Sequence, residues 1–450
     1  MADAEDLEEL AARLAGWARD GEEVEAYVAR ERETSVRAFG GEVESLSSAE
    51  SAGAGIRVVV GHQQGFAYAG SLEEPVLAET LAEARDNASF ATADEHVGLA
   101  RPDSVPPAAL DLWRPDLVSF PTDRKVELAL DLEKRVRAGD SRIRQVEQAN
   151  YGDGAHEGAV ATTTGIAVSF RNTACFVSAY AIAGDGDDTQ TGGGYSVGRS
   201  PAELDPGEAA EDAVERATRL LGARKARSAK LTVVLDRRVS TTLLAIISGT
   251  LSGDAVSKGR SLFADRMGEE VGVGALTLVD DPTNADAYAA ASHDAEGLAC
   301  RRNVPIENGV LTGFLYDTYS ARRASPLSTA SAVRGGFKST PGVGCRALSL
   351  VPGNLDQDGV IASVGEGLFV QSISGVHSGV NPISGDFSVG AEGLMIRQGA
   401  LAEPVREVTI ASTIQRMLLS VLAVGSDLEW LPGVAAGVTL AIGDVSLSGS

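Results

Sequence analysis

A polar, basic segment at residues 223–230, Ala-Arg-Lys-Ala-Arg-Ser-Ala-Lys, separates two parts of the chain that differ in character. Directly after it, residues 231–235 read Leu-Thr-Val-Val-Leu, a run typical of a strand at the start of a new domain. A chain of 450 residues is also long enough for two or more folding units. We therefore expect a C-terminal domain at residues 226–450, joined through this linker to what precedes it.

The part before the linker contains two similar patterns. A Pro-rich, irregular stretch at residues 101–120 predicts a second linker, between one subdomain at 1–100 and another at 121–225. In both subdomains, β-prone runs lead to an amphipathic helix. Strands are expected over 24–30, 34–39, 55–60, 65–69, 143–150, 158–170, 175–183 and near 194–197. Helices are expected over 4–19, 73–88, 122–138 (with Thr122 as its N-cap) and 207–221.

The part after the linker is rich in glycine and contains short runs of mixed character. Two segments predict helices, residues 239–251 and 412–423, and the first is apolar on several faces, which indicates a buried helix. The expected fold class is α+β. An N-terminal α/β part would hold two hairpin-plus-helix subdomains, and a β-rich C-terminal domain would contain one buried apolar helix.

Charge and composition exclude several classes of function. The formal net charge of −24 repels phosphate, so we expect neither a nucleic-acid partner nor an anionic membrane. The N-terminus is acidic and lacks the pattern of a signal peptide, and the longest nearly apolar stretch, 242–247, is too short to span a bilayer. The three cysteines, Cys175, Cys300 and Cys345, form no CxxC motif. These features predict a soluble, cytoplasmic protein.

The sequence offers no resident metal site. No two of its five histidines lie within four residues of each other, so neither HExxH nor HExxxH occurs. The acidic turn at 185–191 resembles a calcium loop, but Gln190 and Ser196 stand where glycine and glutamate are needed. Walker A and GxGxxG motifs are also missing, so no nucleotide cofactor is expected.

One literal motif keeps a hydrolase open as an alternative. Residues 194–198, Gly-Tyr-Ser-Val-Gly, match GxSxG, which would make Ser196 a nucleophile. A nucleophile elbow needs a helix directly after the serine, whereas Arg-Ser-Pro follows here. The alternative is an autonomous hydrolase that uses Ser196 or one of the cysteines.

The segment at residues 374–390, Ser-Gly-Val-His-Ser-Gly-Val-Asn-Pro-Ile-Ser-Gly-Asp-Phe-Ser-Val-Gly, is dense in glycine and small polar residues. Such a segment lets another backbone approach closely and offers several hydrogen-bonding groups. It is also typical of a turn-rich hairpin in which His377 makes local hydrogen bonds, and the chemistry of the residues alone favours this second interpretation. The residues alone leave both interpretations open.

This segment also begins the strongest resemblance in the chain. Residues 375–412, GVHSGVNPISGDFSVGAEGLMIRQGALAEPVREVTIAS, resemble the C-terminal signature of the TldD/TldE (PmbA) peptidase family in its TldE form. Further similar blocks follow the family's order: 42–45 with 55–58, 251–261 with 278–282, 315–322, and 351–353. The similarity covers about residues 24–430.

The resemblance implies a role without catalysis. In this family, TldD supplies zinc through HExxxH on a buried helix plus a cysteine, whereas the corresponding helix here, 239–251, has no histidine and no glutamate. It implies no catalytic residue and no metal in this chain, zinc in a TldD-like partner subunit, and a heterodimer that holds an extended peptide as an added β-strand. A homodimeric peptide-binding protein without an enzyme partner is a further alternative. The candidate substrate contacts are Asp317, Tyr319, Ser320, His377, Asn381, Asp386 and Ser388.

Overall fold

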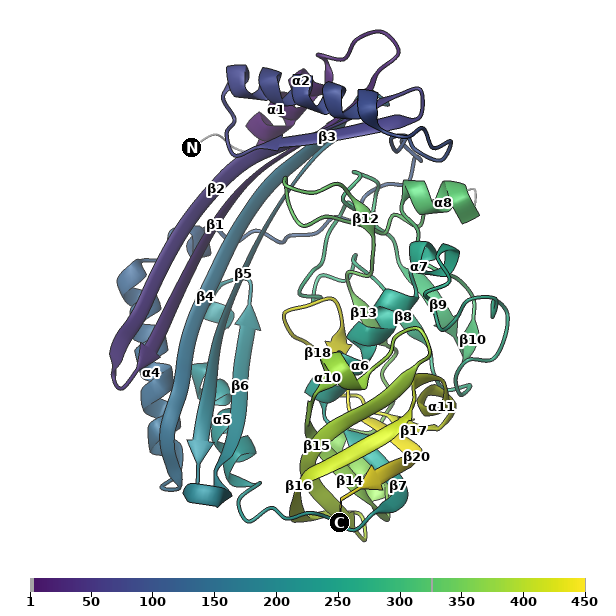
Figure 1. Cartoon of the computed structure of the whole chain (residues 1–450). Helices are drawn as coiled ribbons and strands as arrows, with labels where there is room; N and C mark the ends of the chain where they lie inside the picture. The colour runs from purple at the N-terminus through teal and green to yellow at the C-terminus, as the bar shows by residue number, and fades with distance from the viewer. Residues whose placement is uncertain (1–3, 325–326, 450) are drawn as a thin grey trace.

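One long sheet carries the N-terminal half of the molecule. The structure, a computed structural model, describes residues 4–324 and 327–449. Six antiparallel strands lie in the order β3-β2-β1-β4-β5-β6, so both expected subdomains contribute to the same sheet (Figure 1). The strands are β1 (Glu23–Phe39), β2 (Glu42–Val60), β3 (Gln63–Ala69), β4 (Ile143–Thr162), β5 (Ala167–Ala183) and β6 (Gln190–Gly198).

The two faces of this sheet follow from the alternation of side chains along each strand. In β1, Ala26 and Val28 pack against helix α1, and Val36 and Ala38 belong to the core beneath helices α4 and α5. Tyr27, on the opposite face, packs against the C-terminal half. The helices are α1 (Ala4–Ala15), α2 (Glu74–Phe90), α3 (Pro115–Val118), α4 (Thr122–Gly139) and α5 (Pro206–Thr218).

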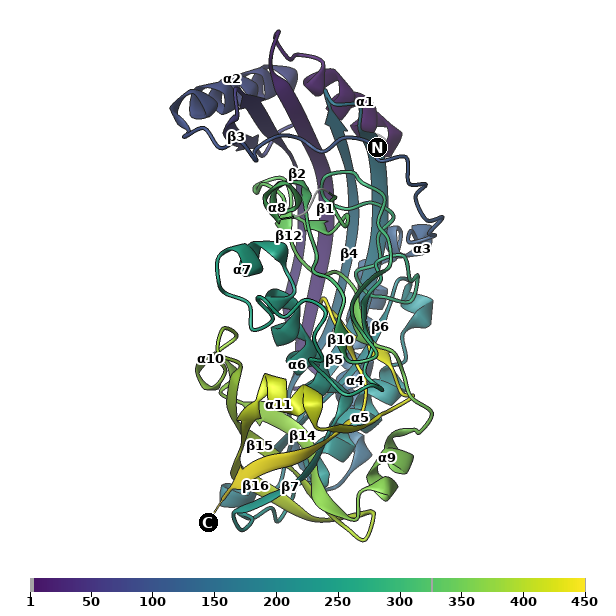
Figure 2. The ribbon, with the colours of Figure 1, turned by 90° about the vertical axis from the view of Figure 1, so that its right-hand side faces the viewer.

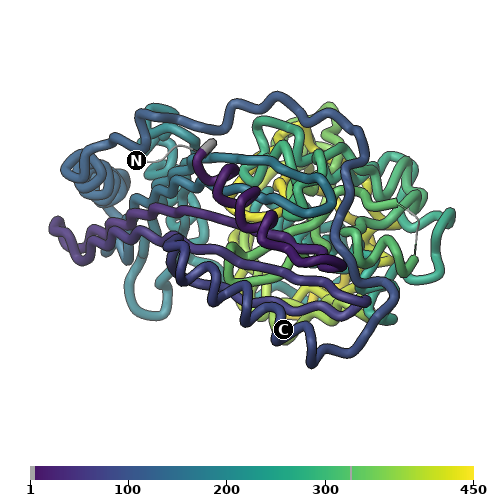
Figure 3. Tube along the Cα trace, turned by 90° about the horizontal axis from the view of Figure 1, so that it is seen from above, coloured from purple at the N-terminus to yellow at the C-terminus, as the bar shows by residue number. Residues whose placement is uncertain are grey.

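The C-terminal half faces the sheet along much of its length, as Figure 2 shows from the side and Figure 3 from above. Its main sheet has the order β16-β15-β14-β7-β20-β17, and an additional pairing of β16 with β20 closes five of these strands into a ring. These strands are β7 (Ala229–Leu235), β14 (Glu366–Ser374), β15 (Asp386–Arg397), β16 (Ala400–Thr413), β17 (Val421–Val424) and β20 (Leu440–Ser448). The expected α+β class with a β-rich C-terminal domain is confirmed.

Smaller elements complete this half. Helix α6 (Arg237–Thr250) packs into the largest apolar core through residues such as Leu243, Leu244 and Ile247. The remaining helices are α7 (Gly253–Ser257), α8 (Thr318–Ala324), α9 (Gln357–Ser363), α10 (Val376–Gly379) and α11 (Ile414–Leu419). The remaining strands are β8 (Leu278–Asp280), β9 (Asn303–Glu307), β10 (Val310–Leu311), β11 (Ala332–Val333), β12 (Gly342–Val343), β13 (Leu348–Leu350), β18 (Glu429–Trp430) and β19 (Ala436–Gly437). No helix in the described ranges is long and apolar enough to cross a membrane.

Four expectations about local structure are wrong. The strand expected over 158–170 is divided in two, because a turn at residues 163–166 separates β4 from β5. The segments 24–30 and 34–39 are one strand, because polar residues between them continue the pairing of β1 with β2 and β4. Thr122 is the first residue of α4 and makes no side-chain cap; Pro121 occupies the cap position. The helix expected over 412–423 is the six-residue α11, since its C-terminal part forms β17 and pairs with β20.

The close packing of α5 on β6 gives a stability prediction. A Cβ atom at Gly194 would lie 1.8 Å from the carbonyl oxygen of Ala209 in α5, so no side chain fits there. We expect Gly194→Ala to destabilise the protein by about 1–3 kcal/mol, the usual cost of overpacking. Gly70→Ala is the control, because no atom lies within 4 Å of the added carbon. Equal melting temperatures for the two variants would contradict this packing.

Candidate functional site

A groove lies where the edge of the N-terminal sheet meets helix α6. Its volume is about 470 Å³, and both halves of the chain contribute to it. In the described part of the chain, β6 pairs with β5 alone, so its outer edge flanks this groove. The lining residues are Tyr180, Thr191, Gly192, Gly193, Tyr195, Arg216, Arg238, Val239, Thr241, Thr242, Gln371, Ser372, Ile373, Leu431 and Pro432.

Arginine side chains fix the geometry of the groove. The guanidinium of Arg238, on α6, lies 4.8 Å from the centre of the Tyr195 ring and donates hydrogen bonds to the carbonyl of Gly193 and to Asp212. The hydroxyls of Tyr180 and Tyr195 are 3.0 Å apart, and burial followed by this hydrogen bond raises the pKa of Tyr195. Tyr195 therefore stays neutral, and the polar groups of the groove wall include the guanidinium groups of Arg216 and Arg238.

The α6 wall does not suit a metal ion. The side chains that α6 presents to the groove are Arg238, Val239, Thr241 and Thr242, none of which is a usual zinc ligand. Across residues 4–324 and 327–449, no group of three histidine, cysteine, aspartate or glutamate side chains is arranged to hold a metal. The donor groups on the described residues therefore do not fit a resident zinc.

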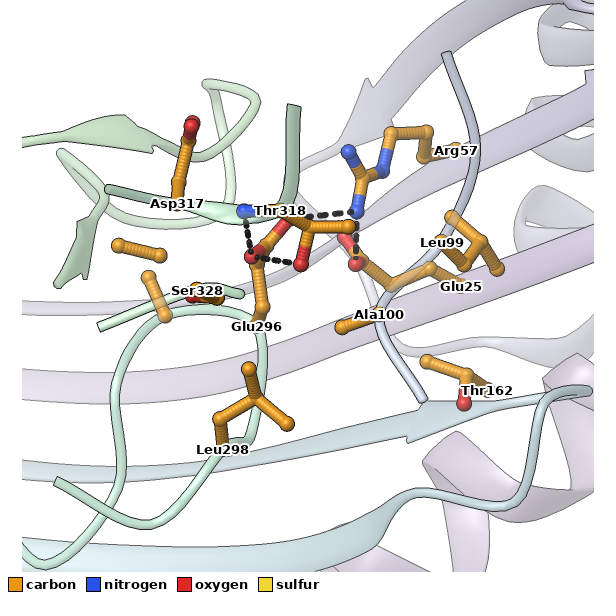
Figure 4. Close-up of polar contacts among 12 residues, drawn as sticks. Glu25, Arg57, Leu99, Ala100, Thr162, Glu296, Leu298, Asp317, Thr318 and Ser328 are labelled. Atoms are coloured by element: carbon orange, nitrogen blue, oxygen red, sulfur yellow. Dashed lines mark hydrogen bonds and ion pairs between the residues drawn. The ribbon is translucent and has the colours of Figure 1, made fainter. Parts of the chain in front are cut away.

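A buried ionic cluster joins the two halves at a second place (Figure 4). Arg57 on β2 lies opposite Glu25 on β1, and their Nη2 and Oε2 atoms are 2.5 Å apart. The same nitrogen lies 3.8 Å from Oε1 of Glu296, whose other oxygen accepts hydrogen bonds from the backbone and hydroxyl of Thr318. Arg334 completes the cluster, with its Nη2 2.5 Å from Oε1 of Glu25.

The charges in this cluster determine its protonation. Burial raises the pKa of Glu25, but the positive charges of Arg57 and Arg334 outweigh it, so the pKa ends below the usual value. Glu296 is different: burial raises its pKa, the charge of Arg57 opposes the shift, and the charge of Asp317 adds to it. Glu25 is therefore held ionised between two arginines, while Glu296 is the carboxyl more readily protonated.

Three predicted site residues lie beside this cluster. Asp317 and Tyr319 line a hollow of about 440 Å³ together with Arg57 and Glu296. The Tyr319 hydroxyl donates to Asp94 across the two halves, at 2.8 Å. Ser320 is buried, and its backbone N–H and hydroxyl both donate to Asp317 Oδ1, so this pair acts as a cap for α8.

The other four predicted residues lie elsewhere. His377, Asn381, Asp386 and Ser388 are exposed, in or next to the connection between β14 and β15, and line none of the hollows described here. The side chain of Asn381 accepts hydrogen bonds from backbone groups of the same turn. The Asp386 carboxylate accepts a hydrogen bond from the Ser384 hydroxyl. The structure thus separates the seven candidates into two groups.

The cluster and the groove include residues that sequence analysis missed. Arg57 and Glu25 carried a signal, because a charged residue inside an otherwise apolar strand needs a buried partner. Arg238 and Tyr195 carried none, since exposed arginines and tyrosines are common. Only the tertiary structure brings these two residues to one wall.

Ser196 lacks the surroundings of a nucleophile. It lies within strand β6 rather than at a strand-to-helix turn, and its hydroxyl accepts a hydrogen bond from the backbone N–H of Asp205 at 2.9 Å. The cysteines are equally unsuited, since all three are buried and free.

We expect the native thiols to resist alkylation. Burial, followed by the charge of Asp153, raises the pKa of Cys175 to about 12, burial raises that of Cys300 to about 12, and burial raises that of Cys345 well above its usual value. Because the thiolate is the reactive form, iodoacetamide should label the folded protein negligibly in an hour at pH 7.5 and label three thiols after denaturation. Rapid labelling of one native cysteine, counted by mass spectrometry, would revive the hydrolase alternative.

Comparison with known proteins defines the class of this fold as metallopeptidase-like. The PmbA/TldA metallopeptidase domain 1 matches residues 24–88, the central domain matches 115–221 and the C-terminal domain matches 228–449. The chain belongs to the PmbA/TldD metallopeptidase family, as its sequence resemblance indicated.

Individual relatives are similar to this chain over nearly its full length. Metalloprotease PmbA of Escherichia coli O157:H7 is 28% identical over 97% of this chain and 94% of the relative. A metalloprotease PmbA homolog of Haemophilus influenzae is 26% identical over 93% of this chain and 91% of its own length. Two solved structures share the fold: TldE from Thermococcus kodakarensis (TM-score 0.87, 21% identity, 99% of this chain and 100% of that chain) and a Thermotoga maritima protein described as a candidate modulator of a DNA gyrase (TM-score 0.89, 24% identity, 98% and 100%).

Proposed function

We propose that this chain is the non-catalytic subunit of a heterodimeric zinc peptidase, in which it holds an extended peptide for a TldD-like partner that carries HExxxH. The observation that carries the proposal is the chemistry of helix α6. The chain belongs to a metallopeptidase family, yet helix α6 presents arginine, valine and threonine side chains to the groove beside it. Zinc and the catalytic residues then belong to the partner subunit.

The edge of strand β6 supports the peptide-holding role. An extended peptide can add to an unpaired strand edge through its main chain, which gives binding with little sequence selectivity. Glycines at 192 and 193 keep side chains small beside the groove, and Arg238 can bind carbonyl groups, as it does with that of Gly193. A peptide in the groove would therefore meet main-chain groups on one side and α6 on the other.

A reconstitution experiment tests the proposal. This chain, an HExxxH-bearing relative from the same genome, and their equimolar mixture are each incubated with a fluorogenic unstructured peptide and zinc. We expect cleavage by the mixture only, together with a single size-exclusion peak of one copy of each chain. Hydrolysis by this chain alone that survives a chelator would overturn the proposal, and a stable homodimer that ignores the partner would favour the binding-protein alternative. A cytoplasmic location remains part of the proposal.

A further inference from the structure

A third hollow between the two halves has a different chemistry from the other two. It has a volume of about 270 Å³ and shares no lining residue with the groove at α6 or with the hollow at Asp317. The sheet contributes residues of β1, β4 and β5, and the C-terminal half contributes residues 290–295, 334–336 and 346. Nothing in the proposed peptide groove depends on it.

Arginine side chains dominate this hollow, which we call the arginine pocket. Arg171, Arg334 and Arg346 all line it. The Arg334 side chain is only 2% exposed, and one of its nitrogens, Nη2, is bound by Glu25. Arg171 is exposed and stacks on Trp113 at 5.2 Å, so it lies at the open side of the pocket.

Several donors in these arginines have no hydrogen-bond partner, although the guanidinium of Arg334 also lies 4.5 Å from the centre of the Tyr27 ring. In the described ranges, the buried Nε and Nη1 atoms of Arg334 and the buried Nε of Arg346 make no hydrogen bond. Neither Arg171 nor Arg346 forms an ion pair with a described carboxylate. Buried N–H groups are nearly always satisfied, so three orphaned guanidinium nitrogens around one hollow indicate that a ligand or water belongs there.

The remaining polar groups favour an anion over a cation. His156 stacks on Phe170, and burial followed by the charge of Arg346 lowers its pKa to about 4, so its ring is neutral at pH 7. The carboxylate of Glu31 lies 3.6 Å from that ring. Asp294 binds three backbone N–H groups, and burial, followed by the charge of Glu296, raises its pKa to about 7. Asp294 is about half ionised at pH 7, so Glu31 and Asp294 together balance only part of the positive charge of Arg171 and Arg346.

The apolar part of the pocket lining further restricts the kinds of anion that fit. Leu112, Phe170, Ala290 and Ala291 give it apolar walls next to the arginines. A planar guanidinium binds a carboxylate through two parallel hydrogen bonds, and the apolar walls suit a short aliphatic stem. We propose that the arginine pocket binds a carboxylate on a short apolar stem, with Arg346 as its principal contact. The C-terminal residue of a peptide and a free short acid share this chemistry.

Binding to this chain alone tests the inference, independently of any partner or peptidase activity. The ligands are N-acetyl-alanine, N-acetyl-trialanine, their C-terminal amides and inorganic phosphate, measured by isothermal titration calorimetry at fixed ionic strength. We expect both acids to bind and both amides to bind at least tenfold more weakly, because the amides lose a charge-assisted pair. Tighter binding of the trialanine acid identifies a peptide end, and equal binding of the two acids identifies a free short acid.

Variants locate the site. Arg346→Gln should weaken acid binding about tenfold or more. Arg260→Gln, at an exposed arginine outside every hollow described here, should leave it unchanged. Ala291→Phe fills the pocket without replacing an arginine and should also abolish binding, which covers the case that Arg346→Gln misfolds. The proposal is overturned if acids and amides bind alike, if phosphate binds as well as the acids, or if neither pocket variant weakens binding.

Discussion

Replacing Arg57 by alanine will destabilise the protein by about 3–5 kcal/mol, the cost of leaving buried charges without their partner. The variant removes the cation between Glu25 and Glu296, whose side chains are 1% and 2% exposed. Glu25 then keeps only Arg334 as its partner, and Glu296 loses the cation beside it. Because Glu25 and Arg57 lie on the sheet and Glu296 and Arg334 on the C-terminal half, the loss should loosen the contact between them.

The matched control is Arg101→Ala. Arg101 also pairs with a glutamate of β1, Glu23, at 2.8 Å, but its side chain is 67% exposed. An exposed pair of this kind contributes only about 0–1 kcal/mol. Urea unfolding followed by tryptophan fluorescence should therefore separate the two variants clearly. Similar midpoints for Arg57→Ala and Arg101→Ala would show that the buried cluster does not hold the halves together.

Filling the groove at α6 will have the largest effect on function. In Thr242→Trp a large ring occupies space beside β6, where the proposal places the peptide. Turnover by the reconstituted complex should fall about tenfold or more, because the loss of about 1.4 kcal/mol of binding is already tenfold. The effect should appear in kcat/KM, with the heterodimer still forming on size exclusion.

Glu211→Trp is the control for that variant. Glu211 is exposed on α5 and does not line the groove, so a tryptophan there adds the same side chain elsewhere. Full activity of Thr242→Trp in an intact heterodimer would contradict a peptide in this groove. It would direct attention to the exposed connection at residues 374–390, where four of the predicted contacts lie.

The sequence was informative where local pattern decides structure. The amphipathic stretch at 122–138 became α4 almost residue for residue, and the apolar segment at 239–251 became α6. Long strands were harder, because residues 31–33 are polar and interrupt the apolar pattern of β1. They lie between the part of the sheet covered by α1 and the part covered by α4, where the structure leaves Arg32 and Glu33 exposed.

Less of the candidate site than of the fold could be predicted from the sequence. Asp317 and Tyr319 could be selected because they belong to a block that resembles the family, and both line a hollow at the junction of the two halves. The groove could not be predicted, since Tyr195 and Arg238 meet only after β6 and α6 have packed together. Contacts between residues far apart in sequence depend on the tertiary fold, which local pattern does not encode.

Metal analysis of the two chains after reconstitution tests the central claim most directly. The active complex is separated into its subunits under mild denaturation, and zinc is measured in each by inductively coupled plasma mass spectrometry, with this chain purified alone as reference. The account predicts about one zinc per heterodimer, found with the HExxxH-bearing partner, and background zinc in this chain in both preparations. Stoichiometric zinc in this chain, lost together with peptide hydrolysis on chelation, would contradict it.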